Sequence, residues 1–556
     1  MLSDQCIGDP HPRFQNFIVP RIERLESVHL PASDEYQKIY KNQGDYHANS
    51  WLREVHDLVK PFFSGTIVKD VDSVCLALTE RFGGPIRWAL STENVKEIDR
   101  VTSQAEQFLK SMGLPFPKGK TKETSLARLQ HVKWWRKQFN KAIPRIVDQV
   151  SRKLGHVHQS NDCYLSESAY VLHQKKMKSS KDFLESMEAE NDVGQKFPLV
   201  EMAGKSVSNP HIRRTELMVR CRGIEERAQE IGYNTALFIT LTAPSKYHGF
   251  SQGGIPNEKW NRANPRMVND YLNVVWSRIR SDLARKGIEY FGIRVAEPHH
   301  DGTPHWHVLL FTNTPEKCVS SIFLKHGLAE DGLERGAKKH RVKIETIQES
   351  KGSATGYIAK YISKNIDGHG IELDSYGNAA SKSAARITAW SRVWGIRQFQ
   401  FFGTPSVIVW RELRRVRRVV FEPYEGARQS ADSANFNAFC REMNLHNIKL
   451  YRAPWIDMET GETVSQYNVY GELKPMPVRG VQALSKLPNG SKDAPEYIPL
   501  ITRLFNWTIR KSADALDLKS EAPWTCVNNC TDVSDRDHFL FSAIANNSYR
   551  GPPVYN

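Results

Sequence analysis

The sequence predicts an α+β fold: a central antiparallel sheet flanked by helices, with a helical region before it and a small mixed region after it. Short apolar, β-branched runs alternate with segments of helical periodicity between residues 236 and 365. Residues 35–195 have a mostly helical pattern, and strand and turn signals return beyond residue 447. Hydrophobic residues make up 40% of the 556 residues, so the chain can bury sizeable cores.

The N-terminal region is expected to be helical over residues 31–204. It follows a polar, proline-rich arm at residues 1–30 that we expect to be poorly ordered. Apolar residues at helical spacing predict one helix over residues 125–150, which Pro144 should break or kink. A charged, exposed helix is predicted over residues 175–190.

The central domain is expected at residues 205–425. Its first helix, over residues 213–232, ends in a glycine suited to a C-cap. Apolar or alternating runs predict four strands, at residues 236–241, 290–297, 305–311 and 342–347. Helical periodicity predicts the helices between and after them, at residues 265–286, 316–340, 353–365 and 381–397.

The end of the chain is expected to be basic and then mixed. Residues 407–418 contain WRELRRVRR and belong to the predicted basic helices that close the central domain. Residues 426–556 are predicted to form a mixed region with strands and turns, a helix around residues 497–513, and a partly disordered tail.

The charge of the chain points to a polyanionic partner. The formal net charge is +15 and the isoelectric point is about 9.3. Lysine and arginine side chains that neutralise phosphates release condensed counterions, which favours nucleic acid binding. A basic protein without a specific partner is the alternative at this point.

Membrane and secreted proteins are disfavoured. No apolar run reaches the roughly 18–20 residues that cross a bilayer, so no membrane association is expected. The first residues lack the basic and apolar segments of a signal peptide. The 8 cysteines are scattered, as in a protein of the reducing cytoplasm, and the pair Cys526 and Cys530 is weak evidence for a metal site. We therefore expect a cytoplasmic protein.

A pair of histidines marks a candidate metal site. His305 and His307 are separated by one residue in a predicted strand, so both side chains point to the same face. Glu297 ends the preceding strand, and the turn between the strands would bring its carboxylate beside the imidazoles. Two imidazoles and a carboxylate suit a divalent metal that keeps open positions for phosphate and water. Such His-x-His pairs also occur without metal, and His299 and His300 in the turn are secondary candidates.

A pair of tyrosines marks a candidate nucleophile. Tyr357 and Tyr361 are four residues apart in a predicted helix, so they lie one turn apart on one face. Lys360 and Lys364 form a second such pair on the adjacent face. A phenol is a poor nucleophile at neutral pH, because its reference pKa is about 10, and a nearby cation favours the phenolate. Taken alone, paired tyrosines on an amphipathic helix are more often packing residues.

Three motifs in order then identify a resemblance. FITLT, EPHHDGTPHWHVLLF and GYIAKYISKN resemble the three motifs of rolling-circle replication initiators in the HUH endonuclease superfamily. The version with two tyrosines is similar to the replication gene A proteins of temperate tailed bacteriophages. NPHIRRTELMVRCRGIEERAQEIG before these motifs, with ITAWSRVWGIRQFQFFG and VWRELRRVRR after them, also resembles this family. The resemblance covers residues 205–420 well and the helical N-terminal region loosely.

The resemblance implies an HUH-type sheet and roles for the residues of the motifs. His305 and His307 would bind Mg²⁺ or Mn²⁺, with Glu297 as the third ligand. Tyr357 and Tyr361 would be alternating nucleophiles. Lys360 lies within the tyrosine motif and would contact the phosphate. Thr240 and Thr242 match the first motif, whose role is expected to be structural.

The implied reaction is a transesterification that starts rolling-circle replication. One tyrosine attacks a phosphodiester of single-stranded or extruded origin DNA, becomes joined to the 5′ phosphate and frees a 3′-hydroxyl that primes synthesis. The second tyrosine cuts the regenerated site, and the phosphotyrosine bond lets religation proceed without ATP.

Further DNA contacts are expected from basic residues near the site and after it. They are Lys364, Arg414, Arg415, Arg417 and Arg418. The arginines can equally form a solvated basic face. No helicase P-loop (GxxxxGK[ST]) occurs in the sequence, so a host helicase and host replication proteins are expected partners.

Two other classes stay open at this stage. One is a related HUH enzyme, a conjugative relaxase or a transposase, although the double tyrosine favours an initiator over transposases with one tyrosine. The other is a basic DNA-binding protein without enzymatic activity.

Overall fold

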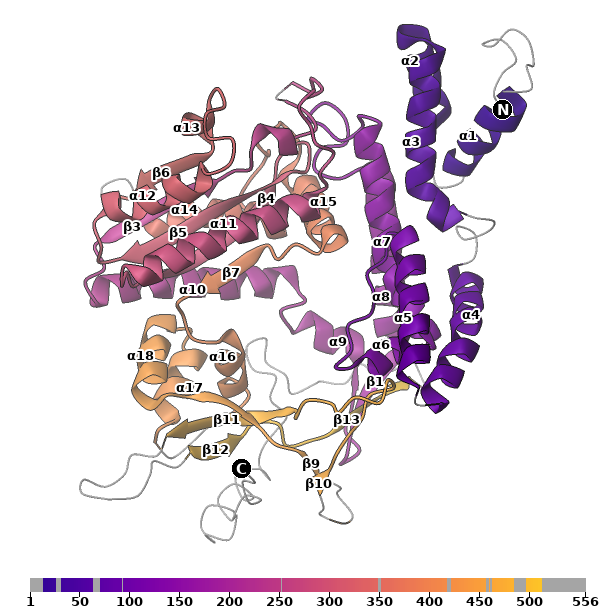
Figure 1. The fold of residues 1–556 in the computed structure, drawn as a ribbon. Coiled ribbons are helices and arrows are strands. Elements are labelled where there is room, and N and C mark those ends of the chain that lie inside the picture. The colour runs from indigo at the N-terminus through magenta and orange to yellow at the C-terminus, as the bar shows by residue number, and fades with distance from the viewer. Residues whose placement is uncertain are drawn as a thin grey trace.

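The structure is a computed structural model and has the α+β composition that the sequence predicts, with antiparallel sheets and helices (Figure 1). It describes residues 14–26, 32–63, 71–92, 94–251, 253–348, 352–417, 422–456, 460, 463–484 and 497–512. Among these residues, no helix combines the length and the apolar character that crossing a membrane requires.

A five-stranded sheet forms the centre of the molecule, in the order β6-β3-β5-β4-β7, with antiparallel neighbours throughout. Its strands are β3 (Thr235–Leu241), β4 (Phe291–Pro298), β5 (Pro304–Thr312), β6 (Val342–Thr346) and β7 (Phe399–Phe402). The four strands that the sequence predicts are confirmed to within one residue at each end. The short edge strand β7 was not predicted, because FQFF carries too few residues to show a period.

One face of this sheet packs against α11 (Pro265–Arg285), α12 (Glu316–Gly327) and α15 (Ala380–Trp394). Trp306, Val308 and Leu310 of β5 point into this core and are fully buried. Because side chains alternate along a strand, the residues between them point to the other face.

The other face is covered by α10 (Pro210–Glu230) and α14 (Ala354–Ile366), which share a core with Leu309 and Phe311 of β5. The same core extends to α16 (Val407–Leu413), α17 (Glu425–Asp432) and α18 (Phe436–His446). His305 and His307 therefore share a sheet face with the helix that carries both tyrosines.

Connecting segments complete the central part. The helical stretch expected over residues 316–340 is α12 followed by the short α13 (Ala337–His340), and a 3₁₀ turn, η2 (Ser245–Tyr247), follows β3. The helix predicted over residues 381–397 ends earlier, because Gly395 takes a left-handed conformation at its C-cap (φ 64°).

The N-terminal region has its own core of helices, built around Trp135 and Phe139. Residues 14–26, expected to belong to a poorly ordered arm, form η1 (Phe14–Ile18) and α1 (Val19–Glu26) instead. The other helices are α2 (Ala32–Gln43), α3 (Asp45–Phe63), α4 (Val71–Ser91), α5 (Val95–Ser111), α6 (Lys122–Leu129), α7 (Val132–Lys153), α8 (Glu167–Glu185) and α9 (Leu199–Gly204).

Two predictions for this region are wrong. The single helix expected over residues 125–150 is two, α6 and α7, and Pro144 lies inside α7 without ending it. Buried residues on both sides of Pro144, Phe139 and Val147 among them, hold α7 against its neighbours and offset the hydrogen bond that proline removes. The helix expected over residues 175–190 ends at Glu185, since the next residues join a sheet.

Small sheets complete the C-terminal region. One has the order β12-β11-β8, from β8 (Lys449–Arg452), β11 (Val478–Leu484) and β12 (Tyr497–Ile501). Another, of order β13-β1-β2, pairs a segment that follows α8 with one near residue 510, through β1 (Met187–Asn191), β2 (Lys196–Pro198) and β13 (Trp507–Lys511). A two-stranded ribbon pairs β9 (Trp455–Ile456) with β10 (Thr463–Val464).

The helix expected around residues 497–513 is therefore wrong, because this segment contains β12 and β13. Pro499 cannot donate to a helical hydrogen bond, but an edge strand such as β12 accommodates it. The partner of β13 lies more than 300 residues earlier in the chain, which no local pattern reveals. The predicted tail beyond residue 512 lies outside the described residues.

Candidate metal and tyrosine site

The pairing of three strands gathers the residues of the first candidate site. β4 and β5 form an antiparallel pair in which Glu297 lies opposite His305. On the other side of β5, Thr240 of β3 lies opposite His307. Directly opposed residues point to the same face of a sheet, so Glu297 and both histidines meet on the face that α14 covers.

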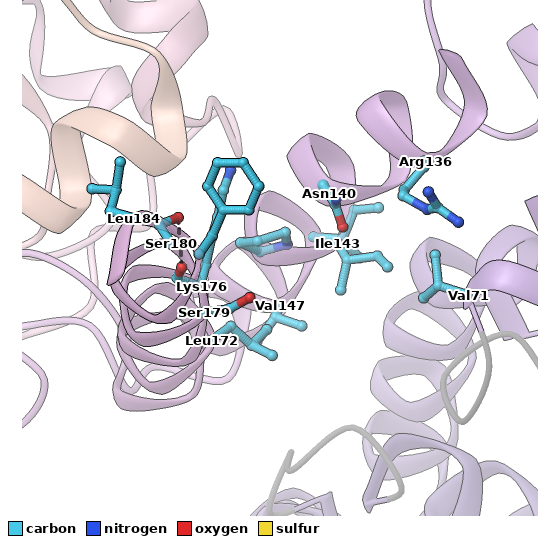
Figure 2. Close-up of a pocket in the computed structure, with 13 residues that line it drawn as sticks. Val71, Arg136, Asn140, Ile143, Val147, Leu172, Lys176, Ser179, Ser180 and Leu184 are labelled. Carbon is cyan, nitrogen blue, oxygen red and sulfur yellow. Dashed lines mark hydrogen bonds between the residues drawn. The ribbon is translucent and has the colours of Figure 1, made fainter. Parts of the chain in front are cut away.

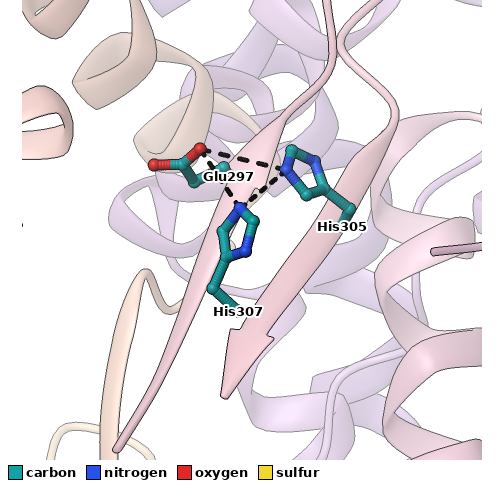
Figure 3. A group of neighbouring side chains, drawn as sticks. All are labelled: Glu297, His305 and His307. Atoms are coloured by element: carbon teal, nitrogen blue, oxygen red, sulfur yellow. Dashed lines mark hydrogen bonds and ion pairs between the residues drawn. The ribbon is translucent and has the colours of Figure 1, made fainter. Parts of the chain in front are cut away.

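The three side chains converge closely (Figure 3). The Nε2 atoms of His305 and His307 are 3.0 Å apart. The Glu297 Oε2 atom lies 3.9 Å from His305 Nε2 and 3.6 Å from His307 Nε2. The structure thus brings together the three residues that the sequence analysis selected.

Burial and neighbouring charges set the protonation of this site. Glu297 is only 1% exposed, and burial by itself raises its pKa. The hydrogen bond with His307, together with the charge of Lys364, outweighs burial and holds the pKa of Glu297 below its ordinary value. Burial, with the neighbouring rings of His299 and His307, holds the pKa of His305 well below its ordinary range. Glu297 is therefore a carboxylate beside a neutral His305 imidazole.

This donor set fits a divalent cation. Adjacent ligands of an octahedral ion at about 2.1 Å lie about 3.0 Å apart, which is the separation of the two Nε2 atoms. The Thr240 Oγ1 atom lies 3.1 Å from His307 Nδ1, and a proton held in this contact leaves a lone pair on Nε2. Imidazole nitrogens with one carboxylate suit Mn²⁺ and related ions, so Glu297, His305 and His307 can hold one.

The tyrosine helix lies directly against this group. The ring of Tyr361 lies 4.0 Å from that of His307, centroid to centroid, and 5.3 Å from that of Phe238 on β3. Tyr357, one turn earlier, has its ring 6.0 Å from the same Phe238 ring. Ile358 of this helix is fully buried in the core against the sheet. The helix thus presents both phenols on the side of the histidines.

Burial and nearby carboxylates affect the phenol of Tyr361. Tyr361 is half-buried, and burial, followed by the charges of Glu297 and Glu345, raises its pKa to about 12. Its phenol is therefore protonated at neutral pH in the absence of an added cation.

The two lysines of α14 also differ. Lys360 is exposed, whereas Lys364 is buried and its Nζ lies 3.4 Å from Glu297 Oε2. Lys364 was expected to contact DNA, but its ammonium lies against the carboxylate of the candidate metal site.

The arginines after the sheet do not join this group. Helix α16 ends at Leu413, and it packs against α17, β8 and β11 below the central sheet in Figure 1. Arg414 and Arg415 follow its end half-buried, and Arg415 Nε lies 3.5 Å from Glu412 Oε2. Arg417 is exposed, and Arg418 lies outside the described residues.

Some site residues were missed. The Asn365 amide donates to Glu297 Oε1 and to the backbone carbonyl of Tyr361, the latter at 2.7 Å. Its position four residues after Tyr361, on the same helix face, was the available signal. His299, a secondary candidate in the turn, stacks on His305 with ring centroids 4.0 Å apart, and burial lowers its pKa to about 3.

Comparisons with known proteins agree with these motifs. Residues 91–369 match the model of the family described as bacteriophage replication gene A protein (GPA). This range includes Glu297, both histidines and both tyrosines. It begins earlier in the helical region, and ends earlier, than the range of residues 205–420 over which the motifs resemble the family. No solved structure matches the chain significantly.

Several curated proteins are similar over most of the chain. The replication gene A protein of Escherichia phage 186 is 38% identical over 73% of this chain and 59% of its own. The probable replication protein P12 of Pseudoalteromonas phage PM2 is 35% identical over 84% of this chain and 73% of its own. A probable replication endonuclease from a prophage-like region of Salmonella paratyphi A is 32% identical over 74% of this chain and 53% of its own. The chain thus spans between half and three fifths of the first and third of these relatives, and it belongs to the bacteriophage replication gene A protein family.

Proposed function

We propose that this chain is a metal-dependent, site-specific single-strand DNA endonuclease of the HUH type that nicks and rejoins a phage replication origin. The contact between the Tyr361 and His307 rings carries this proposal, since it sets a candidate nucleophile against a candidate metal ligand. Membership in a family of phage replication proteins supports it, as does the name replication endonuclease given to the Salmonella relative.

The metal would be Mg²⁺ or Mn²⁺, held by Glu297, His305 and His307. When bound, it supplies positive charge that polarises the scissile phosphate and stabilises a phenolate. The buried carboxylate of Glu297 would supply the negative charge of the ligand set, and a phosphate held at this site would lie next to Tyr361, whose ring contacts that of His307. Thr240 and Asn365 fix the orientation of His307 and Glu297.

The tyrosines perform the covalent step. The phenol oxygen of Tyr361 or Tyr357 attacks phosphorus and loses its proton, the bond from phosphorus to the 3′ oxygen breaks, and that oxygen leaves as a 3′-hydroxyl after gaining a proton. The other tyrosine, one helical turn away, cuts the regenerated origin, and the free 3′-hydroxyl then displaces the first tyrosine. Lys360 is exposed beside both phenols and contacts the phosphate.

The partners follow from this reaction. The substrate is single-stranded or extruded origin DNA in the bacterial cytoplasm, and Arg414, Arg415, Arg417 and Arg418 contribute phosphate contacts. Lys364 acts instead through Glu297, by its buried ion pair. A host helicase supplies unwinding, because no P-loop motif occurs in the sequence.

The test is nicking of supercoiled cognate origin DNA in Mn²⁺. Wild-type protein should convert it to the open circle and become attached to the 5′ end, whereas the Tyr357→Phe, Tyr361→Phe double variant should form no adduct. Tyr271→Phe is the matched control. Tyr271 lies on α11, on the sheet face opposite to α14, and this variant should react normally. A His305→Ala, His307→Ala protein that still nicks in EDTA would refute the metal assignment.

The same test separates the rival functions. A basic DNA-binding protein without activity would shift the DNA but leave it supercoiled and form no adduct. A relaxase or transposase would form an adduct, but mapping of the nick would place it at a transfer origin or an element end instead of a replication origin.

A further inference from the structure

A groove between α7 and α8 lies outside the metal and tyrosine site (Figure 2). It has a volume of about 990 Å³. Ile143 and Val147 of α7 form one wall, and Leu172 and Phe183 of α8 form the other. The ring of Phe183 is 52% exposed, an unusual state for a phenylalanine. The groove therefore offers apolar and aromatic surface on its walls.

Polar groups at the rim of the groove are cationic or neutral. Arg136 and Lys176 line it, together with Asn140, Ser179 and Ser180, and no acidic side chain is among the described residues that line it. Arg136 has an exposed partner, Asp72, at 2.8 Å. Arg136 and Lys176 therefore give the lining a positive charge, part of which Asp72 offsets.

The helix beneath the groove is strongly basic. Helix α7 carries several lysines and arginines but only one acid, Asp148. That carboxylate is fully buried and is used by Arg152, by the backbone of Ser166 and by the Trp394 indole, at 2.8–3.1 Å. The exposed surface of α7 thus carries positive charge with no acid of its own to offset it.

The cations near the groove act on one another. Partial burial and the charges of Lys137 and Arg145 lower the pKa of Lys141, and the charge of Lys176 on α8 acts in the same direction. Arg145, whose Nε donates to the carbonyl of Val393 at 2.7 Å, has its own pKa lowered by burial and by another arginine. The electrostatic repulsion between such cations is relieved when a polyanion binds among them, and this relief favours binding.

The groove is connected to the tyrosine helix through one element. Helix α15 packs against both α7 and α8, and it also packs against α14. Helix α15 therefore links the tyrosine helix to the two helices that form the groove.

We propose that the groove between α7 and α8 binds single-stranded DNA, with bases against Phe183 and the apolar walls, and with phosphates on Lys176, which lines the groove, and on Lys141 of α7 outside its lining. Single-strand sites combine a basic track with exposed aromatic rings in this manner. An exposed ring such as that of Phe183 can stack on unpaired bases, whose faces are covered in a duplex, so a separated strand is the occupant. This inference rests on the proposed function, because nicking is the source of the single strand. The helical N-terminal region would then bind that strand.

The test measures binding of a fluorescent 40-nucleotide single strand of mixed sequence to the full chain by anisotropy, over a range of salt. The variant Lys141→Gln, Lys176→Gln should bind at least tenfold more weakly. Its salt slope should fall by about 1.4, because each lost phosphate contact contributes about 0.7. Phe183→Ala should weaken binding about tenfold with an unchanged slope, as expected for loss of stacking.

The matched control is Lys96→Gln, Lys110→Gln on α5, where both lysines are also exposed. It changes the net charge equally and should bind like wild type. The proposal is overturned if the groove variant and the control bind the strand with equal affinity and slope. It is also overturned if the two substitutions weaken the binding of polyglutamate but not the binding of the single strand, which would indicate an acidic protein partner.

Failure of this proposal can be told from failure of the proposed function. Adduct formation on supercoiled origin DNA reports on the tyrosines, whereas anisotropy needs no catalysis. The groove variant should still form the adduct. If the wild-type chain forms no adduct but binds the strand through the groove, the proposed function is refuted and the proposal for the groove is supported.

Discussion

Replacing Asn365 by alanine tests whether the tyrosine helix and the candidate metal ligands act as one unit. Asn365 is fully buried near the end of α14. Its amide donates both to Glu297 Oε1 and to the carbonyl of Tyr361. The substitution removes these two hydrogen bonds and leaves the backbone of the helix intact.

The expected size of the effect follows from these contacts. A hydrogen bond to a charged group contributes about 1.5–3 kcal/mol, and about 1.4 kcal/mol corresponds to a tenfold change in affinity. Glu297 would keep Lys364 as a partner but would no longer be held toward the histidines. We expect Asn365→Ala to weaken Mn²⁺ binding by about 10- to 100-fold, the range found for residues that orient metal ligands.

The Mn²⁺ affinity is measured by calorimetric titration, and the free energy of unfolding of the same proteins is measured in urea. Asn269→Ala is the control, because Asn269 is also buried and accepts from the Trp306 indole at 3.3 Å, but on the opposite face of the sheet. Both variants should lose stability, and only Asn365→Ala should lose Mn²⁺ affinity. Equal Mn²⁺ affinity in the wild type and both variants would refute the reasoning.

Other predictions test the sheet, the titration and the basic region. A Cβ on Gly292 would lie 1.9 Å from the Leu309 carbonyl oxygen, so Gly292→Ala should destabilise the protein at the upper end of the roughly 1–3 kcal/mol typical of overpacking; an unchanged urea midpoint would contradict this. Burial and two neighbouring cations lower the pKa of His173 to about 4. The unfolded chain then binds more protons than the folded chain between about pH 6.5 and 4, so the free energy of unfolding falls as the pH is lowered through this window, and His173→Gln should flatten that part of the stability curve. Replacing Arg414 and Arg415 by glutamine should reduce the salt slope of single-strand binding, and an unchanged slope would show that neither contacts phosphate.

Local patterns in the sequence were sufficient for the elements that carry the site. Short apolar runs rich in β-branched residues favour buried strands, and the four strands predicted from such runs were confirmed. The spacing of His305 and His307 fixes both on one face of a strand, and the spacing of Tyr357 and Tyr361 fixes both on one face of a helix. These relations depend only on backbone periodicity, which acts between near neighbours.

Local patterns failed where distant segments decide the conformation. Residues 497–513 have apolar spacing that also suits a helix, and their strands exist because β11 and β1 supply partners from elsewhere in the chain. Pro144 was expected to interrupt a helix, but packing on both sides of it holds α7 together. In each case a tertiary contact outweighs a local preference, which is smaller than the free energy of burying a side chain.

The sequence by itself therefore determined the histidine pair, the tyrosine pair, the likeness to the gene A family and the positive charge of the chain. Only the tertiary structure decided that α14 lies on the histidine face of the sheet, with the Tyr361 ring against His307. It also decided that Lys364 and Asn365 reach Glu297 and that α7 and α8 leave a basic groove. The physical reason is the same for all of these: they are contacts between elements, and such contacts depend on how the faces of the elements pack together.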